Sequence, residues 1–372
     1  MGKQNTKRVY VALSGGVDSS VAAALLKQAG FAVTGVFFKP WSPRPNFSKK
    51  NLGGQATGLL ACTWKEDCLS AVRAAAALGI PFKTWDLSKE YKKAVADYMI
   101  NSYRHGLTPN PDVMCNKEIK FGVVLKRALK EGADFIATGH YAKIQKLKIK
   151  NSFKLLKGRD RNKDQSYFLW TLNQKQLRHC LFPVGDLTKP EVRKLAKKFG
   201  LPNHARKDSQ GVCFIGQLDM EKFLQNYIKP RAGKIIDQSG RVIGQHHGAA
   251  YYTIGQRHGL DIKNGQGPYF VYDKNLKSNK IFVTNSAKAV ELFKSSALVK
   301  NISWVSSDTS FDIASRKIDA VIRYRSQPIP TKLIKQGANL LIKFKKPARA
   351  VTPGQSLVIY RGQELLGGGV IS

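Results

Sequence analysis

The chain has 372 residues, of which 42% are hydrophobic, so it can fold into two or three domains with buried cores and is no disordered chain. It carries 62 Lys and Arg against 25 Asp and Glu, a formal net charge of +37 that is spread along the whole sequence. A folded protein this basic most often binds nucleic acid or an anionic membrane. Because no strongly amphipathic basic helix stands out in the sequence, we favour nucleic acid. The alternative explanation of the net charge is that the proteins of the host are generally basic.

No run approaches the roughly 20 apolar residues that a membrane-spanning helix requires. The short apolar run near the N-terminus leads directly into a glycine motif, which favours a strand over a signal peptide. We therefore expect a cytoplasmic protein that does not associate with membranes.

The first elements follow a β-α-β order. "RVYVAL" (8–13) and "FAVTGVFF" (31–38) are apolar, β-branched runs typical of buried strands, and the helical stretch between them ends at Gly30. This order predicts the start of a doubly wound parallel sheet in an α/β domain. Further along, the patterns predict a helix over 69–82, a strand over 83–87, a strand followed by a loop over 134–144, and an amphipathic helix over 189–202.

From about residue 230 the pattern changes to short β runs separated by Gly-rich turns. Five such runs lie at 233–237, 240–248, 251–259, 269–273 and 280–284. From about residue 290 a third group of short strands suits a small antiparallel barrel. We predict an α/β ATP domain (1–220), a small β-rich domain (221–288) and a C-terminal β-barrel (289–372).

"LSGGVDSS" (13–20) lies between the first strand and the first helix. Its glycines allow a tight turn whose N–H groups can face an anion, and the helix N-terminus adds a positive dipole end. It lacks the GK[ST] of a Walker loop and resembles instead the SGGxDS pyrophosphate loop of enzymes that split ATP between the α- and β-phosphates. An ordinary Gly-rich turn is the alternative. Similar loops occur in amidating ligases, so the loop does not choose a substrate.

Five widely spaced cysteines indicate neither a disulfide framework nor a zinc site, and no cluster suggests a tightly held metal. Cys115 follows the turn residues of "PNPDVMCNKEIKF" (109–121), where we expect a rigid loop to meet a helix N-terminus and lower the thiol pKa. Cys213 lies in a Gly-flanked turn of "RKDSQGVCFIG" (206–216), and the pair could face one cleft. A buried structural thiol is the alternative for each, and is our interpretation of Cys62, Cys68 and Cys180.

At this point the chain closely resembles the tRNA-specific 2-thiouridylase family, which installs sulfur at C2 of the wobble uridine. The resemblance spans nearly the whole chain, in the family's order. It rests on the motifs "ALSGGVDSS", "CTWKED", "LGIPF", "TPNPDVMCNKEIKF", "ATGHYA", "NKDQSYFLW", "LFPVGDLTKPEVRKLA", "DSQGVCFIG", "YYTIGQRHGL", "RYRSQ" and "AVTPGQ".

The resemblance implies the catalytic roles. Cys213 carries a persulfide whose terminal sulfur another protein donates, and Cys115 is the partner thiol that frees the sulfur by disulfide formation or assists the attack directly. Asp112 is the general acid or base, and Asn110, Pro111 and Asp112 hold the target base outside the anticodon stack.

The resemblance also implies the ligand contacts. ATP lies against Ala12, Leu13, Ser14, Gly15, Gly16, Val17, Asp18, Ser19, Phe38 and Gly139, with Mg²⁺ that Asp18 could help to hold. Position 38 is usually Met in the family, so Phe is a departure. The implied tRNA contacts are His140, Lys163, Asp164, Gln165, Arg323, Tyr324 and Gln355. The alternative for His140 is a loop histidine that is hydrogen-bonded within the protein. The alternative for Arg323 is a solvated strand residue.

Residues 39–58 depart from the family pattern, because no acidic residue follows the tryptophan there. Any partner contact made by such acids is therefore in doubt, and the sulfur donor is not identified. The family suggests a monomer. Two rivals stand beside this reading: a carbon–nitrogen ligase such as tRNA lysidine synthetase, which needs no cysteine pair, and a basic RNA-binding protein without activity.

Overall fold

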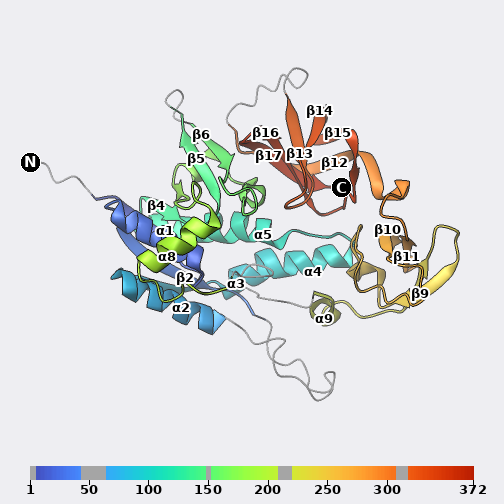
Figure 1. Ribbon diagram of the computed structural model, residues 1–372, viewed down its shortest axis with the longest axis horizontal. Helices are drawn as coiled ribbons and strands as arrows, with labels where there is room; N and C mark the ends of the chain where they lie inside the picture. Colours follow the sequence, from blue (N-terminus) through green and yellow to red (C-terminus); the bar gives the residue numbers. More distant parts are fainter. Residues whose placement is uncertain (1–5, 43–63, 148–151, 208–219, 307–316) are drawn as a thin grey trace, which may run out of the picture.

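The computed structural model describes residues 6–42, 64–147, 152–207, 220–306 and 317–372. Figure 1 shows an α/β part that contains the N-terminus, a small β part near β9 to β11 and a barrel that contains the C-terminus. This is the predicted fold class: a parallel-sheet domain followed by a small β-rich domain and a C-terminal β-barrel.

The α/β part is built on a five-stranded parallel sheet whose order is β3-β2-β1-β4-β7. The strands are β1 (Arg8–Ala12), β2 (Ala32–Lys39), β3 (Phe82–Asp86), β4 (Phe135–Ala137) and β7 (Cys180–Leu181). The chain runs outward from β1 in one direction to β3 and in the other to β7. The strand order therefore reverses between β1 and β4, which is where ligands bind in sheets of this kind.

Helices cover both faces of this sheet. One apolar cluster joins it to α1 (Val17–Gln28), α2 (Trp64–Leu78) and α8 (Lys189–Lys198). A second cluster joins it to α3 (Ser88–Tyr91), the π-helices η2 (Lys92–Ala96) and η3 (Cys115–Val124), α5 (Pro111–Met114) and α6 (Leu125–Lys130). Between these elements α4 (Asp97–Arg104) extends toward the small β domain (Figure 1). The 3-10 helix η4 (Ser166–Leu169) and α7 (Gln174–Leu177) precede β7.

The barrel consists of six antiparallel strands closed by pairing of β12 with β17. They are β12 (Phe293–Trp304), β13 (Ile318–Val321), β14 (Ile329–Gln336), β15 (Asn339–Arg349), β16 (Ser356–Arg361) and β17 (Glu364–Ile371). A hairpin of β5 (Ala142–Lys146) and β6 (Phe153–Lys157) adds to the same sheet through β6 and β17. The sequence predicted a loop where β5 begins, and its pattern did not indicate the β5–β6 hairpin, which is held to the barrel by the distant strand β17.

The small β domain has a four-stranded sheet in the order β10-β11-β8-β9. Its elements are α9 (Met220–Gln225), β8 (Gly233–Ile236), β9 (Val242–His246), η5 (Ala249–Tyr251), β10 (Phe270–Asn275) and β11 (Lys280–Thr284), with η6 (Val290–Leu292) leading to the barrel. The strand expected over 251–259 is wrong. A turn closed by Thr253 and Gln256, with Gly255 and Gly259 at positive φ, replaces it.

Candidate active site

The glycine loop after β1 folds as the sequence predicts, between a buried strand and the N-terminus of α1. Leu13 ends the strand by donating its N–H to the carbonyl of Val36 at 2.8 Å. The Ser19 hydroxyl then donates to the Gly16 carbonyl at 3.0 Å and accepts the Ser14 N–H at 3.2 Å. These bonds hold the loop in a closed turn at the start of α1, where free N–H groups and the helix dipole favour an anion.

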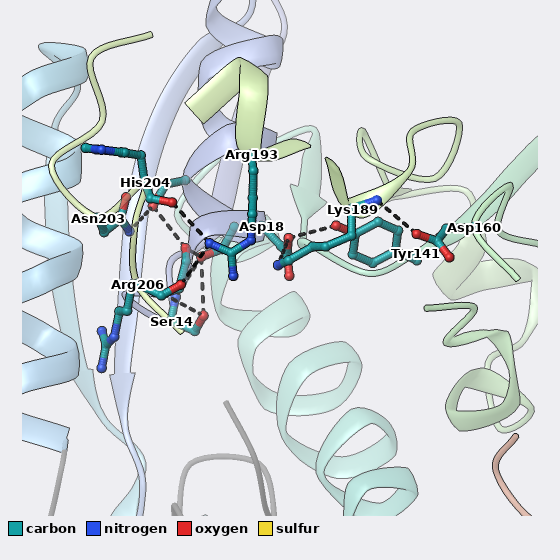
Figure 2. Close-up of polar contacts among 12 residues, drawn as sticks. Ser14, Asp18, Tyr141, Asp160, Lys189, Arg193, Asn203, His204 and Arg206 are labelled. Carbon is teal, nitrogen blue, oxygen red and sulfur yellow. Dashed lines mark hydrogen bonds and ion pairs between the residues drawn. The ribbon is translucent and has the colours of Figure 1, made fainter. Parts of the chain in front are cut away.

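Gly15 requires the absence of a side chain. Its φ is +77°, and a Cβ atom there would collide with the carbonyl oxygen of Asp67 in α2. The Gly15 carbonyl accepts hydrogen bonds from Ser70 at 2.8 Å, Asn203 at 2.9 Å and Arg206 at 3.1 Å. Figure 2 shows Asn203 and Arg206 near Ser14 of the same loop. Three donors from two distant segments therefore fix the loop from the side of α2.

The loop after β4 lies against the glycine loop, as the reversal of strand order requires. A Cβ atom at Gly139 would lie 2.6 Å from the backbone nitrogen of Ser19. Gly139 is therefore beside the predicted ATP loop. The side chain of Phe38 is 2% exposed and packs in the core with Trp85.

Asp18 is held by two residues that the sequence analysis missed. Its Oδ1 accepts a hydrogen bond from the Tyr141 hydroxyl at 2.8 Å. The same oxygen forms an ion pair with the Lys189 ammonium at 2.7 Å (Figure 2). The two partners are 123 and 171 residues away in the sequence. No local sequence pattern predicts a contact between residues so far apart. The sequence marked Tyr141 and Lys189 only in that each lies in a motif on which the family resemblance rests.

Cys115 lies within a helix rather than at the junction of a loop and a helix. Asn110 caps the helix by accepting the N–H of Val113 at 3.3 Å, and Pro111 occupies the first turn. The helix therefore begins one turn before Cys115, which opens the π-helix η3 and is 0% exposed. The expected position of Cys115 was wrong because proline and asparagine start the helix earlier.

The barrel and the small β domain hold the segment that precedes Asn110. The side-chain amide of Gln355 donates to the carbonyls of Thr108 and Pro109, both at 3.1 Å. The Thr108 N–H donates to the Pro353 carbonyl at 2.9 Å, and its hydroxyl lies 3.0 Å from that of Thr253. Gln355 was predicted to contact tRNA, and both hydrogens of its amide are used within the protein.

Three aromatic rings pack together where η4 meets the segment that follows β13. The ring centroids of Phe168 and Tyr324 are 4.4 Å apart, and those of Tyr167 and Tyr324 are 6.1 Å apart. Burial, chiefly, and the nearby carboxylates of Asp164 and Asp112 raise the pKa of Tyr324. The predicted tRNA residue Tyr324 thus packs against the ring of Phe168 in η4.

Arg323 lies half-buried where the small β domain meets the barrel. Its Nη2 is 3.3 Å from the carbonyl of Ile254 and 3.2 Å from the Thr352 hydroxyl, to which it donates. Burial lowers the pKa of Arg323. Its guanidinium is thus anchored at two points, so Arg323 is not the solvated strand residue that was the alternative for this position.

The remaining predicted tRNA residues cluster around the loop after β4. His140 is buried between the rings of Phe121 and Phe182, with Nδ1 2.6 Å from the Thr138 hydroxyl. Burial, with a smaller contribution from Lys120, holds the pKa of His140 well below its usual value, so the imidazole is neutral.

The "KDQ" segment holds the chain before η4. Asp164 accepts the N–H groups of Gly158 and Ser166 at 3.0 and 3.1 Å, and burial raises its pKa. Gln165 accepts the N–H of Tyr141 at 3.1 Å, while Lys163 is half-buried. The side chains of Asp164 and Gln165 are thus engaged within the protein.

Cys213 and Cys62 lie outside the residues that the structure describes. Cys180 is buried, donates to the Gln176 carbonyl at 3.1 Å, and has a pKa raised by burial, as expected of a structural thiol. Cys68 is half-buried in α2. Within the described ranges, no group of three His, Cys, Asp or Glu side chains could hold a metal, and no helix is long and apolar enough to cross a membrane.

Comparisons with known proteins cover the whole chain. Three family models match in order: a tRNA methyl transferase HUP domain over residues 7–217, a tRNA methyl transferase PRC-barrel domain over 221–285 and an aminomethyltransferase β-barrel domain over 294–371.

Similar curated proteins are each named "tRNA-specific 2-thiouridylase MnmA". The protein of Nitrosomonas eutropha is 43% identical, with 99% of each chain covered. The protein of Flavobacterium johnsoniae is 41% identical, with 98% of this chain and 100% of its own chain covered. The protein of Listeria monocytogenes is 42% identical, with 98% of this chain and 94% of its own chain covered. The chain belongs to the family of the tRNA-specific 2-thiouridylases.

Proposed function

We propose that this protein is an ATP-dependent tRNA-specific 2-thiouridylase, a sulfurtransferase that replaces the C2 oxygen of the wobble uridine (position 34) with sulfur and releases AMP and pyrophosphate. The observation that carries the proposal is the full-length identity of 41–43% to relatives of that name. It is supported by a glycine loop at the strand-order reversal and by a capped helix that carries Asp112 and Cys115.

The first step activates the base. The C2 carbonyl of uracil resembles that of a urea and is a poor electrophile. Its oxygen attacks the α-phosphorus of ATP, the bond to the bridging oxygen breaks, and pyrophosphate leaves with the electron pair. Asp112 accepts the N3 proton as the oxygen attacks and returns it after sulfur has entered. ATP lies along residues 12–19 and Gly139, with Mg²⁺ as the counter-ion of its phosphates.

The second step delivers sulfur. The terminal sulfur of a Cys213 persulfide attacks C2, and AMP leaves with the former C2 oxygen; Cys115 then attacks the sulfur of Cys213, which releases 2-thiouridine and leaves a Cys115–Cys213 disulfide. Alternatively Cys115 attacks first, and the freed hydrosulfide attacks C2. Both routes end in the same disulfide, which an external thiol must reduce before the next turnover. A sulfur-donor protein reloads Cys213.

The tRNA is bound through its anticodon loop, from which the target base is extruded. Asn110, Pro111 and Asp112 receive this base, and Tyr324 supplies an aromatic face. His140, Lys163, Asp164, Gln165, Arg323 and Gln355 shape the surface around them, directly or by holding loops. We propose domains 1–220, 221–288 and 289–372, acting as a cytoplasmic monomer in which the barrel helps to clamp the tRNA.

The test is nucleoside mass spectrometry of unmodified tRNA incubated with the protein, Mg²⁺ and a persulfide source. We expect 2-thiouridine only when ATP is present, and none with Cys115→Ala. A tRNA modification other than 2-thiouridine that survives Cys115→Ala, with AMP still formed, would favour a carbon–nitrogen ligase. Failure of wild type to convert ATP in the presence of tRNA would favour a binding protein without activity.

A further inference from the structure

The contact between Lys189 and Asp18 brings a lysine to the glycine loop from a different part of the fold. Lys189 is the first residue of α8, and its ammonium lies 2.7 Å from Oδ1 of Asp18 in the first turn of α1. Its side chain is only 11% exposed. Figure 2 shows the two residues pointing toward each other from their separate helices.

The position of Lys189 is fixed from both ends. Its backbone N–H donates to Oδ2 of Asp160 at 2.9 Å, and a capping box between Thr188 and Glu191 sets the start of α8. At the other end, Tyr141, which is 1% exposed, donates its hydroxyl to the same Oδ1 of Asp18 that pairs with the lysine. Lys189 is therefore held in one place rather than sampling the surface.

Lys189 places positive charge beside a loop that is already suited to an anion. The N-termini of α1 and α8 each contribute roughly half a positive charge, and the Lys189 ammonium adds a full one. Asp18 holds the ammonium and Asp160 holds the backbone N–H of the same lysine. Because Asp18 lies in the first turn of α1, the ammonium is held next to the glycine loop. The N–H groups of that loop and the ammonium can therefore face the same phosphate.

We propose that Lys189 is a phosphate-binding residue of the ATP site, held in place by Asp18 and Tyr141. This inference rests on the proposed function and extends it. As the uracil oxygen bonds to the α-phosphorus and the bridging bond breaks, negative charge grows on the departing pyrophosphate, and the Lys189 ammonium stabilises it without transferring a proton. Asp18, whose Oδ1 already accepts two donors, is then a positioning residue for Lys189.

Equilibrium binding to the full-length protein tests this role. ATP binding is measured by titration, and adenosine, which carries no phosphate, by ligand-observed NMR. We expect Lys189→Met to weaken ATP binding by roughly tenfold or more and to leave adenosine binding unchanged. Lys197→Met, an exposed position in the last turn of the same helix, is the matched control and should bind ATP as wild type does.

The outcomes separate the inference from the function on which it rests. Equal ATP affinity in Lys189→Met and wild type would overturn the role of Lys189, as would an equal loss of ATP and adenosine binding, which would mark a merely structural ion pair. Loss of ATP affinity in Asp18→Asn that adds nothing to the loss in Lys189→Met would support the positioning role of Asp18. A wild-type protein that binds no ATP would overturn the proposed function itself.

Discussion

The side-chain amide nitrogen of Gln355 in the barrel lies 3.1 Å from the carbonyl oxygens of both Thr108 and Pro109, in the segment just before the helix that leads to Cys115. An amide nitrogen has two hydrogens, and these two bonds use both. Gln355 is thus equipped to hold the segment that ends at Asn110, and only its Oε1 remains for an RNA contact.

We therefore expect Gln355→Glu to lower kcat by about tenfold while KM for tRNA changes little. The substitution removes two donors and places a carboxylate against two carbonyls, which costs about 1–3 kcal/mol in the segment beside the base pocket. Steady-state thiolation kinetics measure the split. Gln363→Glu, an exposed barrel residue with the same charge change, is the control. A rise in KM with unchanged kcat would instead favour a direct tRNA contact.

Gly139→Ala should abolish or strongly weaken ATP binding. The added Cβ would lie 2.6 Å from the Ser19 nitrogen and 3.0 Å from Cβ of Asp18, so the glycine loop or the loop after β4 must move. Titration with ATP measures the effect. In Gly244→Ala the new Cβ meets the side chains of Ile235 at 3.4 Å and Ile262 at 3.6 Å, which are ordinary contacts, so that variant should bind ATP normally. Equal affinities in all three proteins would contradict the placement of ATP beside Gly139.

The two buried cysteines should behave differently. Cys115→Ala should lose thiolation but keep ATP binding. Cys180→Ala should keep thiolation and lose about 1 kcal/mol of stability, because its buried thiol donates only to the Gln176 carbonyl of its own segment. Nucleoside mass spectrometry and urea unfolding measure the two effects. Thiolation that depends on Cys180 would show that the roles are assigned to the wrong pair.

The buried Lys274 in β10 should make the free energy of unfolding change with pH in the alkaline range. Burial lowers its pKa from 10.5 to about 8, while its ammonium donates to the Tyr252 carbonyl. Between pH 8 and 10.5 the unfolded chain therefore binds more protons than the folded one, so stability rises with pH in this window, by up to about 3 kcal/mol.

Urea unfolding at pH 8 and pH 10 checks this effect. Other lysines of this basic chain also discharge as the pH rises, so the informative quantity is the difference between wild type and Lys274→Met. The variant should gain less stability than wild type over this interval. An identical gain in both proteins would show that Lys274 keeps its ordinary pKa.

The sequence was sufficient wherever local pattern and neighbouring structure agree. The first strand, its helix and the loop at residues 13–20 follow from apolar periodicity and paired glycines, and the structure places them as predicted. Asn110 and Pro111 carried a capping signal as well, but it was interpreted as a longer loop. The start of the helix before Cys115 was predictable from the preference of proline for the first helical turn.

Contacts between distant segments could not be predicted in this way. Lys189 reaches Asp18 across 171 residues, and Asn203 reaches the Gly15 carbonyl across 188. The β5–β6 hairpin joins the barrel through β17, about as far away in the chain. Such pairings depend on how the sheet and barrel pack, and no residue periodicity encodes them. They nonetheless determine the geometry of the loop and of the base pocket.

The central claim is that this chain moves sulfur from its own cysteine to tRNA in an ATP-dependent step. A single-turnover experiment tests it most directly: protein preloaded with radioactive persulfide sulfur and freed of donor is mixed with unmodified tRNA, with or without ATP and Mg²⁺. We predict stoichiometric transfer of label into 2-thiouridine with ATP, none without it, and neither loading nor transfer in Cys213→Ala. Transfer that does not require ATP, or that persists in Cys213→Ala, would contradict the account.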